Sequence, residues 1–180
     1  MTDGLAERVS LVCLAVWAKL TKRHITDSNS WPLDLASHPE LAKYGAYSPA
    51  QKYSESDIKQ IITYAGEVSS FTHTVWERAN EKRGIDVVLE IDTPGHTASI
   101  AESHPELIAC FEKSPWSTYS HQPPPGQLRF ASEAATEFTK DIFESTLDLV
   151  QSQYFGTGGD EINEKCIVGP RNLHDTDDTA

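Results

Sequence analysis

The sequence predicts an α/β fold in which helices cover a parallel sheet. Predicted strands and helices alternate along the chain, which is the arrangement that buries such a sheet. The clearest strand, residues 85–92, is apolar on both faces, as expected of a strand buried between two layers. Each predicted strand ends in polar side chains, and in (β/α)8 barrels those ends form the site at one rim. The 180 residues fall short of the roughly 250 of a typical barrel, so the chain is either part of a barrel or a smaller open sheet.

Local signals place the individual elements. Ser54 can cap a helix, Asp57 supplies charge to its first turn, and apolar residues follow at helical spacing. A second helix is predicted where apolar residues form a broad stripe with Glu133 near its start. Three consecutive prolines exclude regular structure from the long loop before it. In chain order we expect a short helix within 1–22, a strand that ends near 24–27, a helix at 54–66, a strand at 85–92, a helical segment at 100–110, a loop at 114–130, a helix at 133–152 and a short strand from 154 to 161.

Composition narrows the classes of partner. The formal charge of −12 would repel phosphate backbones, so no nucleic-acid partner is expected. Neutral sugars fit an acidic chain with four Trp and six Tyr. The apolar run at residues 9–18 is too short to span a membrane, and its charged flanks do not make a convincing signal peptide. Cys13, Cys110 and Cys166 lie far apart, so neither a disulfide framework nor a zinc site is indicated.

Three short motifs follow one another at the predicted strand ends. They are His24-Ile25-Thr26-Asp27, then Glu90-Ile91-Asp92-Thr93-Pro94-Gly95-His96, and then Gly158-Gly159-Asp160-Glu161. Together they resemble the β-N-acetylhexosaminidases of glycoside hydrolase family 20, most closely the fungal type. The resemblance implies a partial (β/α)8 TIM barrel covering roughly its second to fourth strands.

The resemblance also divides the chain. It implies an unmatched segment at 1–22, a partial catalytic domain at 23–166 with an insertion at 68–82, and an unmatched tail at 167–180. The insertion stands at a helix-to-strand turn, and its edges fit the codons of an unspliced intron. The resemblance also implies a location that is secreted, vacuolar or lysosomal. A further implication is that full-length relatives can form homodimers.

The resemblance implies a substrate-assisted chemistry. Most retaining glycosidases use two carboxyls, but in this family the 2-acetamido group of the substrate is itself the nucleophile. Glu161 would be the general acid and then the base, and Asp160 would orient the acetamido nitrogen. Asp27 and His96 would form a relay beside Glu161, and Asp92 would anchor the loop at Pro94. Trp31 would stack on the sugar or pack beneath it, and the same alternatives hold for Trp116.

Three functions therefore remain open. The first is hydrolysis of terminal β-linked N-acetylhexosamine from glycans that contain N-acetylglucosamine or N-acetylgalactosamine, without cofactor or metal. Because strands that the family uses are missing, the chain by itself is expected to have little or no activity. The second is a non-catalytic glycan-binding remnant. The third, a metal-dependent hydrolase using Asp27, His96, Asp160 and Glu161, is opposed by the scarcity of His ligands.

Overall fold

The computed structural model describes residues 20–66, 85–150 and 152–167. The predicted insertion at 68–82 lies outside these residues, as does most of the helix expected within 1–22. Residues 20–22 are not helical, because they begin strand β1 (Leu20–His24). Among the described residues, no helix is long and apolar enough to cross a membrane.

A parallel pair of strands forms the centre of the fold. Strand β1 pairs with β4 (Asp86–Glu90), so that His24 stands opposite Glu90. The predicted strand at 85–92 is therefore confirmed, with slightly shorter bounds. The strand expected from residue 154 is reduced to one parallel bridge between Glu90 and Gly156. Backbone hydrogen bonds still hold this segment beside β4, including Thr93 N to Thr157 O at 3.0 Å.

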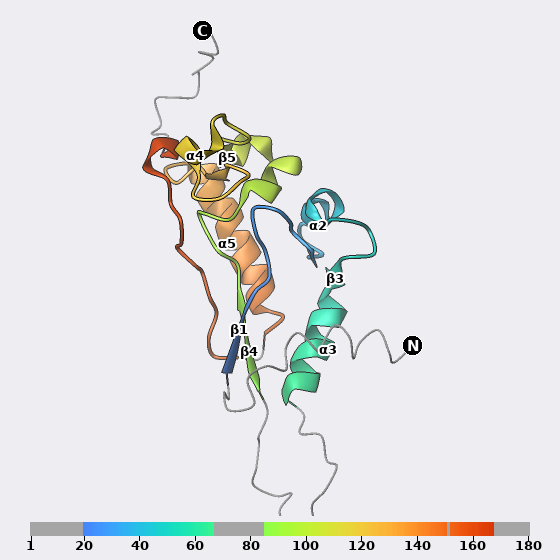
Figure 1. Ribbon diagram of the computed structural model, residues 1–180. Coiled ribbons are helices and arrows are strands. Elements are labelled where there is room, and N and C mark those ends of the chain that lie inside the picture. The colour runs from blue at the N-terminus through green and yellow to red at the C-terminus, as the bar shows by residue number, and fades with distance from the viewer. Residues whose placement is uncertain (1–19, 67–84, 151, 168–180) are drawn as a thin grey trace, which may run out of the picture.

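Two helices flank this pair, and both were predicted. Helix α3 (Glu55–Gly66) begins where the Ser54 hydroxyl accepts from Asp57 N at 3.2 Å and the Asp57 carboxylate accepts from Ser54 N at 2.9 Å. Helix α5 (Glu133–Leu147) is capped by Ser132 and ends five residues before the predicted limit of 152. In Figure 1 the β1–β4 pair runs between α3 and the trace of residues 152–167.

The segment expected to be helical at 100–110 is not one helix. It contains the 3₁₀ helices η2 (Ala98–Glu102) and η3 (Pro105–Leu107), followed by strand β5 (Ile108–Ala109). Pro105 explains the difference, because a proline lacks an N–H and pushes the residue before it out of helical geometry. His104 accordingly has φ −134° and ψ 65°, which lie outside the helical region.

Short elements complete the chain. The long loop at 114–130 is more ordered than predicted, since it contains helix α4 and strand β6, which pairs antiparallel with β5. Strands β2 and β3 pair in parallel beside helix α2. The bounds are β2 (Leu33–Asp34), α2 (Pro39–Gly45), β3 (Tyr53–Ser54), α4 (Trp116–Tyr119), β6 (Gln127–Leu128) and η4 (Glu164–Cys166).

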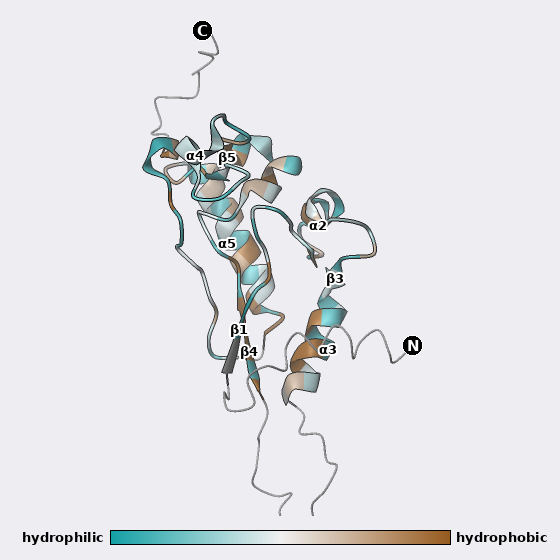
Figure 2. Cartoon of the chain, viewed as in Figure 1, coloured by the Kyte–Doolittle hydropathy of each residue, from teal (hydrophilic) through white to brown (hydrophobic). Residues whose placement is uncertain are grey.

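The core lies between the helices and the central pair. Val87, Leu89 and Ile91 lie on one face of the strand, Val88 and Glu90 lie on the other, and all five are buried. Both faces of β4 are therefore covered, as its apolar pattern predicted. Ile58 and Ile62 reach the core from α3, and Figure 2 shows the corresponding hydrophobic bands on that helix. This packing fixes the strand that carries the central motif.

A disulfide joins Cys110 to Cys166, with their Cα atoms 5.7 Å apart. The expectation that the cysteines form no disulfide framework is therefore wrong for this pair. The two cysteines are 56 residues apart in the sequence, so no local pattern could predict their pairing, and only the fold brings them together. Disulfides persist mainly in oxidising compartments.

Candidate active site

His96 is the centre of a cluster of acidic side chains. Its Nδ1 lies 2.8 Å from Asp27 Oδ1, and its Nε2 lies 3.6 Å from Glu161 Oε2. Asp92 Oδ2 is 3.9 Å from the same Nε2. The structure therefore brings together residues from all three motifs, at the ends of neighbouring parallel segments.

The surroundings of His96 favour its charged form. Burial acts against the charge, but the hydrogen bond to Asp27 and the negative charges of Asp27, Asp92 and Glu161 outweigh it and raise the pKa of His96. An imidazole with this preference can hold a proton between two carboxylates. Asp27 is itself fixed from behind, because Ser99 Oγ donates to its backbone oxygen at 2.7 Å.

Asp92 anchors the segment that carries the acid pair. Its carboxylate is fully buried, and Oδ1 accepts from Gly159 N at 2.8 Å and from Asp160 N at 3.4 Å. A side chain at Gly158 would overlap this carboxylate, whereas one at Gly159 would meet nothing within 4 Å. Asp92 thus holds the double glycine, and its predicted role as the anchor of the loop at Pro94 stays a prediction.

Glu161 and His96 both adopt a backbone conformation that is uncommon for residues other than glycine. Their φ angles are +56° and +54°, in the left-handed region. Such conformations cluster at functional sites, where the surrounding structure imposes them. Asp160 is exposed, and among the described residues no donor is hydrogen-bonded to its carboxylate. It is therefore free to meet a ligand.

A second ionic group lies beneath the cluster, and the sequence did not reveal it. The buried Glu90 carboxylate pairs with Lys22, and its Oε1 lies 2.9 Å from His24 Nδ1. Burial raises the pKa of Glu90, but the hydrogen bonds from Lys22 and His24 outweigh this and leave the pKa lowered. The sequence signal for this group was a charged residue, Glu90, at the end of a largely apolar strand. His24 also stands edge-on to His96, with ring centroids 5.3 Å apart.

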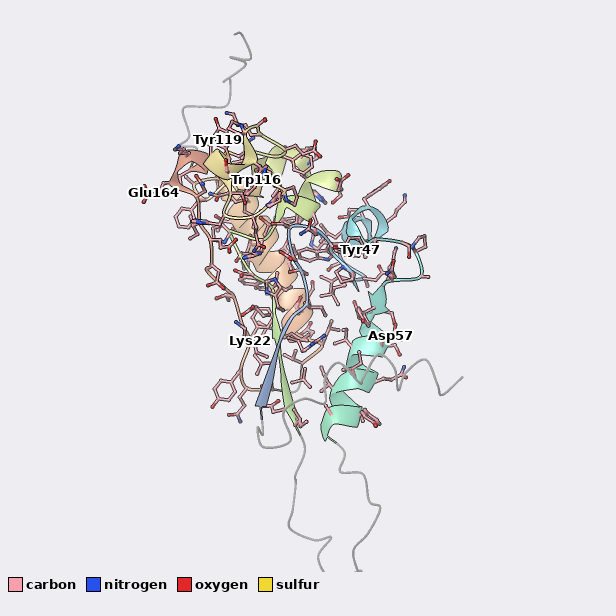
Figure 3. The ribbon with its side chains drawn as sticks, in the orientation of Figure 1. Lys22, Tyr47, Asp57, Trp116, Tyr119 and Glu164 are labelled. Atoms are coloured by element: carbon pink, nitrogen blue, oxygen red, sulfur yellow. A yellow bond between two sulfur atoms is a disulfide. The ribbon has the colours of Figure 1, made fainter. Side chains whose placement is uncertain are left out.

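The two tryptophans considered as sugar-stacking residues differ in their exposure to solvent. Trp31 is 1% exposed and donates from Nε1 to Leu33 O at 3.0 Å, so its ring packs in the core and has no free face for a sugar. Trp116 is 46% exposed and retains a free surface. Figure 3 shows it near Tyr119 and Glu164. Of the two alternatives for Trp31, the structure favours packing.

Two overlapping trios have ligand-type atoms close enough to meet one metal ion. They are His24, Asp27 and His96, and His24, Glu90 and Asp92, with all atoms in a trio within 4.8 Å of one another. Neither trio is the set that the metal-dependent alternative would use, because Asp160 and Glu161 belong to neither. The imidazole nitrogens nearest these carboxylates already form pairs with them.

An open cavity adjoins the cluster on the side of β1. It measures roughly 430 Å³ and is bordered by His24, Asp27, Tyr47 and Tyr53 among others. This volume falls in the usual range of small-molecule sites. Carboxylates, imidazoles and phenol rings around such a space suit a neutral polar ligand.

Comparison with known proteins identifies the family. The family described as "Glycosyl hydrolase family 20, catalytic domain" matches residues 17–173. The chain belongs to glycosyl hydrolase family 20. The match extends a few residues beyond the predicted domain at each end, 23–166.

Curated family 20 relatives are much longer than this chain. A β-hexosaminidase of Arthroderma benhamiae is 36% identical over 156 residues, which cover 86% of this chain and 23% of the relative. A chitooligosaccharidolytic β-N-acetylglucosaminidase of Bombyx mori is 35% identical over 144 residues, covering 79% of this chain and 22% of the relative. The chain thus spans about a quarter of the length of the relatives it matches.

Solved family 20 structures share the fold. The chitobiase of Flavobacterium johnsoniae superposes with a TM-score of 0.63 at 20% identity, covering 88% of this chain and 21% of the chitobiase. An exo-β-N-acetylglucosaminidase of Vibrio harveyi, solved with N-acetylglucosamine, gives a TM-score of 0.62 at 21% identity, covering 89% of this chain and 25% of that enzyme. The chain therefore superposes on part of a TIM-barrel catalytic domain.

Proposed function

We propose that this chain supplies the acid pair of a β-N-acetylhexosaminidase that removes terminal non-reducing β-linked N-acetylhexosamine from chitin oligomers or glycans. One observation carries the proposal, namely that His96 contacts both Asp27 and Glu161. A carboxyl that must give and then take a proton needs a partner that stabilises its charge, and a protonated imidazole does so. Substrates would contain N-acetylglucosamine or N-acetylgalactosamine, and no cofactor or metal enters the reaction.

In the first step, Glu161 protonates the leaving glycosidic oxygen while the substrate's acetamido oxygen attacks the anomeric carbon. The bond to the leaving sugar breaks and a cyclic oxazolinium intermediate forms. In the second step, Glu161 takes a proton from water, which opens the intermediate with net retention. The side chain of Glu161 is 35% exposed, which supports access by both substrate and water.

Asp160 would bind the acetamido N–H and stabilise the positive charge that develops on the nitrogen. Its exposure beside Glu161 supports this role. Asp27 and His96 would act together as the relay that keeps a positive charge next to Glu161. Asp92 would orient the pair through the hydrogen bond of 2.8 Å that Gly159 N donates to its Oδ1. Trp31 would support the site from the core beneath it.

The residues present correspond, in this proposal, to the second, third and fourth strands of the barrel. The parallel order of β1, β4 and the segment at 156–157 supports that assignment. The domain division at 22–23 and 166–167 and the insertion at 68–82 remain part of the proposal. A transcript without codons 68–82 would support the translated-intron origin, and one that retains them would contradict it.

We further propose that the 180 residues alone turn over little substrate. The cavity beside His24 and Asp27 is open, so that a bound sugar would keep contact with water on that side. The same exposure favours a second candidate function, weak glycan binding without turnover. Trp116 and the exposed acid pair would be available for such binding.

The proposed setting is an oxidising one, either secreted or vacuolar or lysosomal. The Cys110–Cys166 disulfide supports it, because structural disulfides rarely persist in the cytosol. A homodimer of a longer form is also part of the proposal.

Two measurements test these functions. In the first, the 180-residue chain is titrated with N-acetylglucosamine by NMR and assayed with a chromogenic N-acetyl-β-glucosaminide. Binding without turnover would favour the binding function. Turnover that Glu161→Gln abolishes, but the nearby Glu164→Gln does not, would establish hydrolysis and overturn the proposed inactivity of the chain.

In the second, residues 85–166 replace their counterpart in the Arthroderma benhamiae β-hexosaminidase, which supplies the remaining strands. A hybrid that hydrolyses the same substrate and loses activity with Glu161→Gln supports the catalytic roles. A folded hybrid whose activity is insensitive to Glu161→Gln would contradict them.

A further inference from the structure

The segment that follows the acid pair is fastened to the proline-rich loop. The Cys110–Cys166 disulfide ties one end, and Asn163 N donates to Gln127 Oε1 at 2.9 Å. Gln127 Nε2 donates back to Asn163 O at 3.2 Å, and Gln127 is only 3% exposed. Asn163 Nδ2 also donates to Thr118 O at 3.2 Å. We call this set of contacts the loop clamp.

Figure 3 shows the same association from the side chains. Trp116 and Tyr119 of α4 lie close to Glu164 of η4, at one end of the molecule. Residues far apart in sequence are thus held together beside the candidate site. Glu161 lies between the clamped segment and the double glycine, so the loop clamp limits where its side chain can reach.

Gln122 extends from this loop to Glu161. Its Nε2 lies 3.3 Å from Glu161 Oε1 and 3.2 Å from Oε2. Its backbone is held by Ser120, whose Oγ donates to Gln122 O and accepts from Gln122 N. The prolines that follow have fixed φ angles, which further restrict the loop. The Glu161 carboxylate therefore lies between the Gln122 amide and the His96 imidazole.

We propose that Gln122 is a positioning residue that holds the Glu161 carboxyl toward His96. The inference rests on the proposed role of Glu161 as acid and base. A primary amide suits that role because it can donate to a carboxylate and can accept from a carboxylic acid after a rotation. A lysine would favour the ionised form alone, and a glutamate would favour the protonated form. The amide alone accommodates both states without adding charge.

The proposal is tested by the reactivity of Glu161 toward a carbodiimide and an amine, measured site by site with peptide mass spectrometry in the whole chain. Gln122→Ala should raise the labelling rate of Glu161 about fivefold, as expected when one hydrogen bond to an exposed carboxylate is lost. Glu164, which is exposed three residues later, serves as the internal reference. Gln60→Ala, on the exposed face of α3, is the matched control and should change neither site.

The substitution Gln122→Glu distinguishes a role of Gln122 in positioning the Glu161 carboxyl from a role in folding alone. Carbodiimides react with the protonated carboxyl, and a second carboxylate in contact with Glu161 would favour its protonated form. The pH profile of Glu161 labelling should therefore move further to higher pH in Gln122→Glu than in Gln122→Ala, because the first adds a negative charge and the second only removes a donor. Cys110→Ser, which opens the loop clamp, should raise Glu161 labelling as Gln122→Ala does.

Unchanged Glu161 labelling in Gln122→Ala, or an unmoved pH profile in Gln122→Glu, would overturn the inference. Labelling needs no turnover, so its outcome is independent of the hydrolysis assay. If labelling changes in the Gln122 variants but the hybrid enzyme is inactive, the proposed function is contradicted and the positioning role of Gln122 is retained. If the hybrid is active but labelling does not change, the proposed function is retained and the positioning role is contradicted.

Discussion

Replacing Gly158 by alanine is the sharpest test of how the acid pair is held. Gly158 has φ +66°, and an added Cβ would overlap the Asp92 carboxylate and lie 2.6 Å from Asp92 Cα. Gly159 has φ +125° but would meet nothing within 4 Å. Both substitutions strain the backbone, and only the first forces Asp92 aside. The two substitutions therefore differ in whether they disturb the Asp92 contact.

The expected difference follows from the bonds that Asp92 would lose. Backbone strain alone costs about 1–3 kcal/mol at either glycine. Moving the Asp92 carboxylate away breaks its hydrogen bond from Gly159 N, which is 2.8 Å long, and a bond to a charged group contributes about 1.5–3 kcal/mol. We therefore expect Gly158→Ala to lower the free energy of unfolding by about 2 kcal/mol more than Gly159→Ala does.

The assay is urea unfolding followed by tryptophan fluorescence, with each substitution also made in an Asp92→Ala background. Removing the Asp92 carboxylate removes its overlap with the added Cβ but leaves the approach to Asp92 Cα at 2.6 Å, so the extra cost of Gly158→Ala should become smaller there. A double-mutant cycle reports this coupling directly. Equal destabilisation by the two alanines, or an undiminished cost in the Asp92→Ala background, would refute the reasoning.

Three other perturbations test the histidine, the disulfide and the tryptophans. The pKa of His96 is raised in the folded state, so the stability that its charged form contributes is complete below about pH 6.5 and is lost as pH rises through the folded pKa. The free energy of unfolding should therefore depend less on pH over that interval in His96→Gln than in the unsubstituted chain. Reducing the Cys110–Cys166 disulfide, which spans 56 residues, should cost about 4 kcal/mol in thermal or urea unfolding, and a change below about 1 kcal/mol would contradict this. Trp31→Ala should cost about 3–5 kcal/mol, and Trp116→Ala under about 1 kcal/mol, in the same unfolding measurements.

The long elements could be predicted because their sequence patterns repeat. The apolar spacing and the Ser54 cap located α3, and the apolar strand at 85–92 located β4. The end of α5 was placed too late because Leu149 continues the apolar stripe. The chain turns at Asp148 instead, and Leu149 still reaches the core from outside the helix. Tertiary packing rather than periodicity determines that boundary.

The residues of the candidate site could be recognised from the sequence, but the contacts that hold them in place could not. The strand-end motifs contain His96 and Glu161, and a parallel sheet brings the ends of its strands close together. The disulfide and the Gln122 contact join segments separated by 56 and 39 residues, and no local pattern encodes either. Glu90 was visible as a charge in an apolar strand, yet its partner Lys22 becomes evident only from the register of β1 against β4.

Neighbouring carboxyls can serve one site only where strand geometry fails. In a regular strand Asp160 and Glu161 would point to opposite faces. Ladder-like bonding to β4 stops at Thr157, and the positive φ angles of Gly158, Gly159 and Glu161 break the alternation that follows. The double glycine thus has two separate tasks, since Gly158 admits the Asp92 carboxylate and Gly159 turns the backbone in open space. A substitution that restored regular strand geometry here would keep both acids and still separate them.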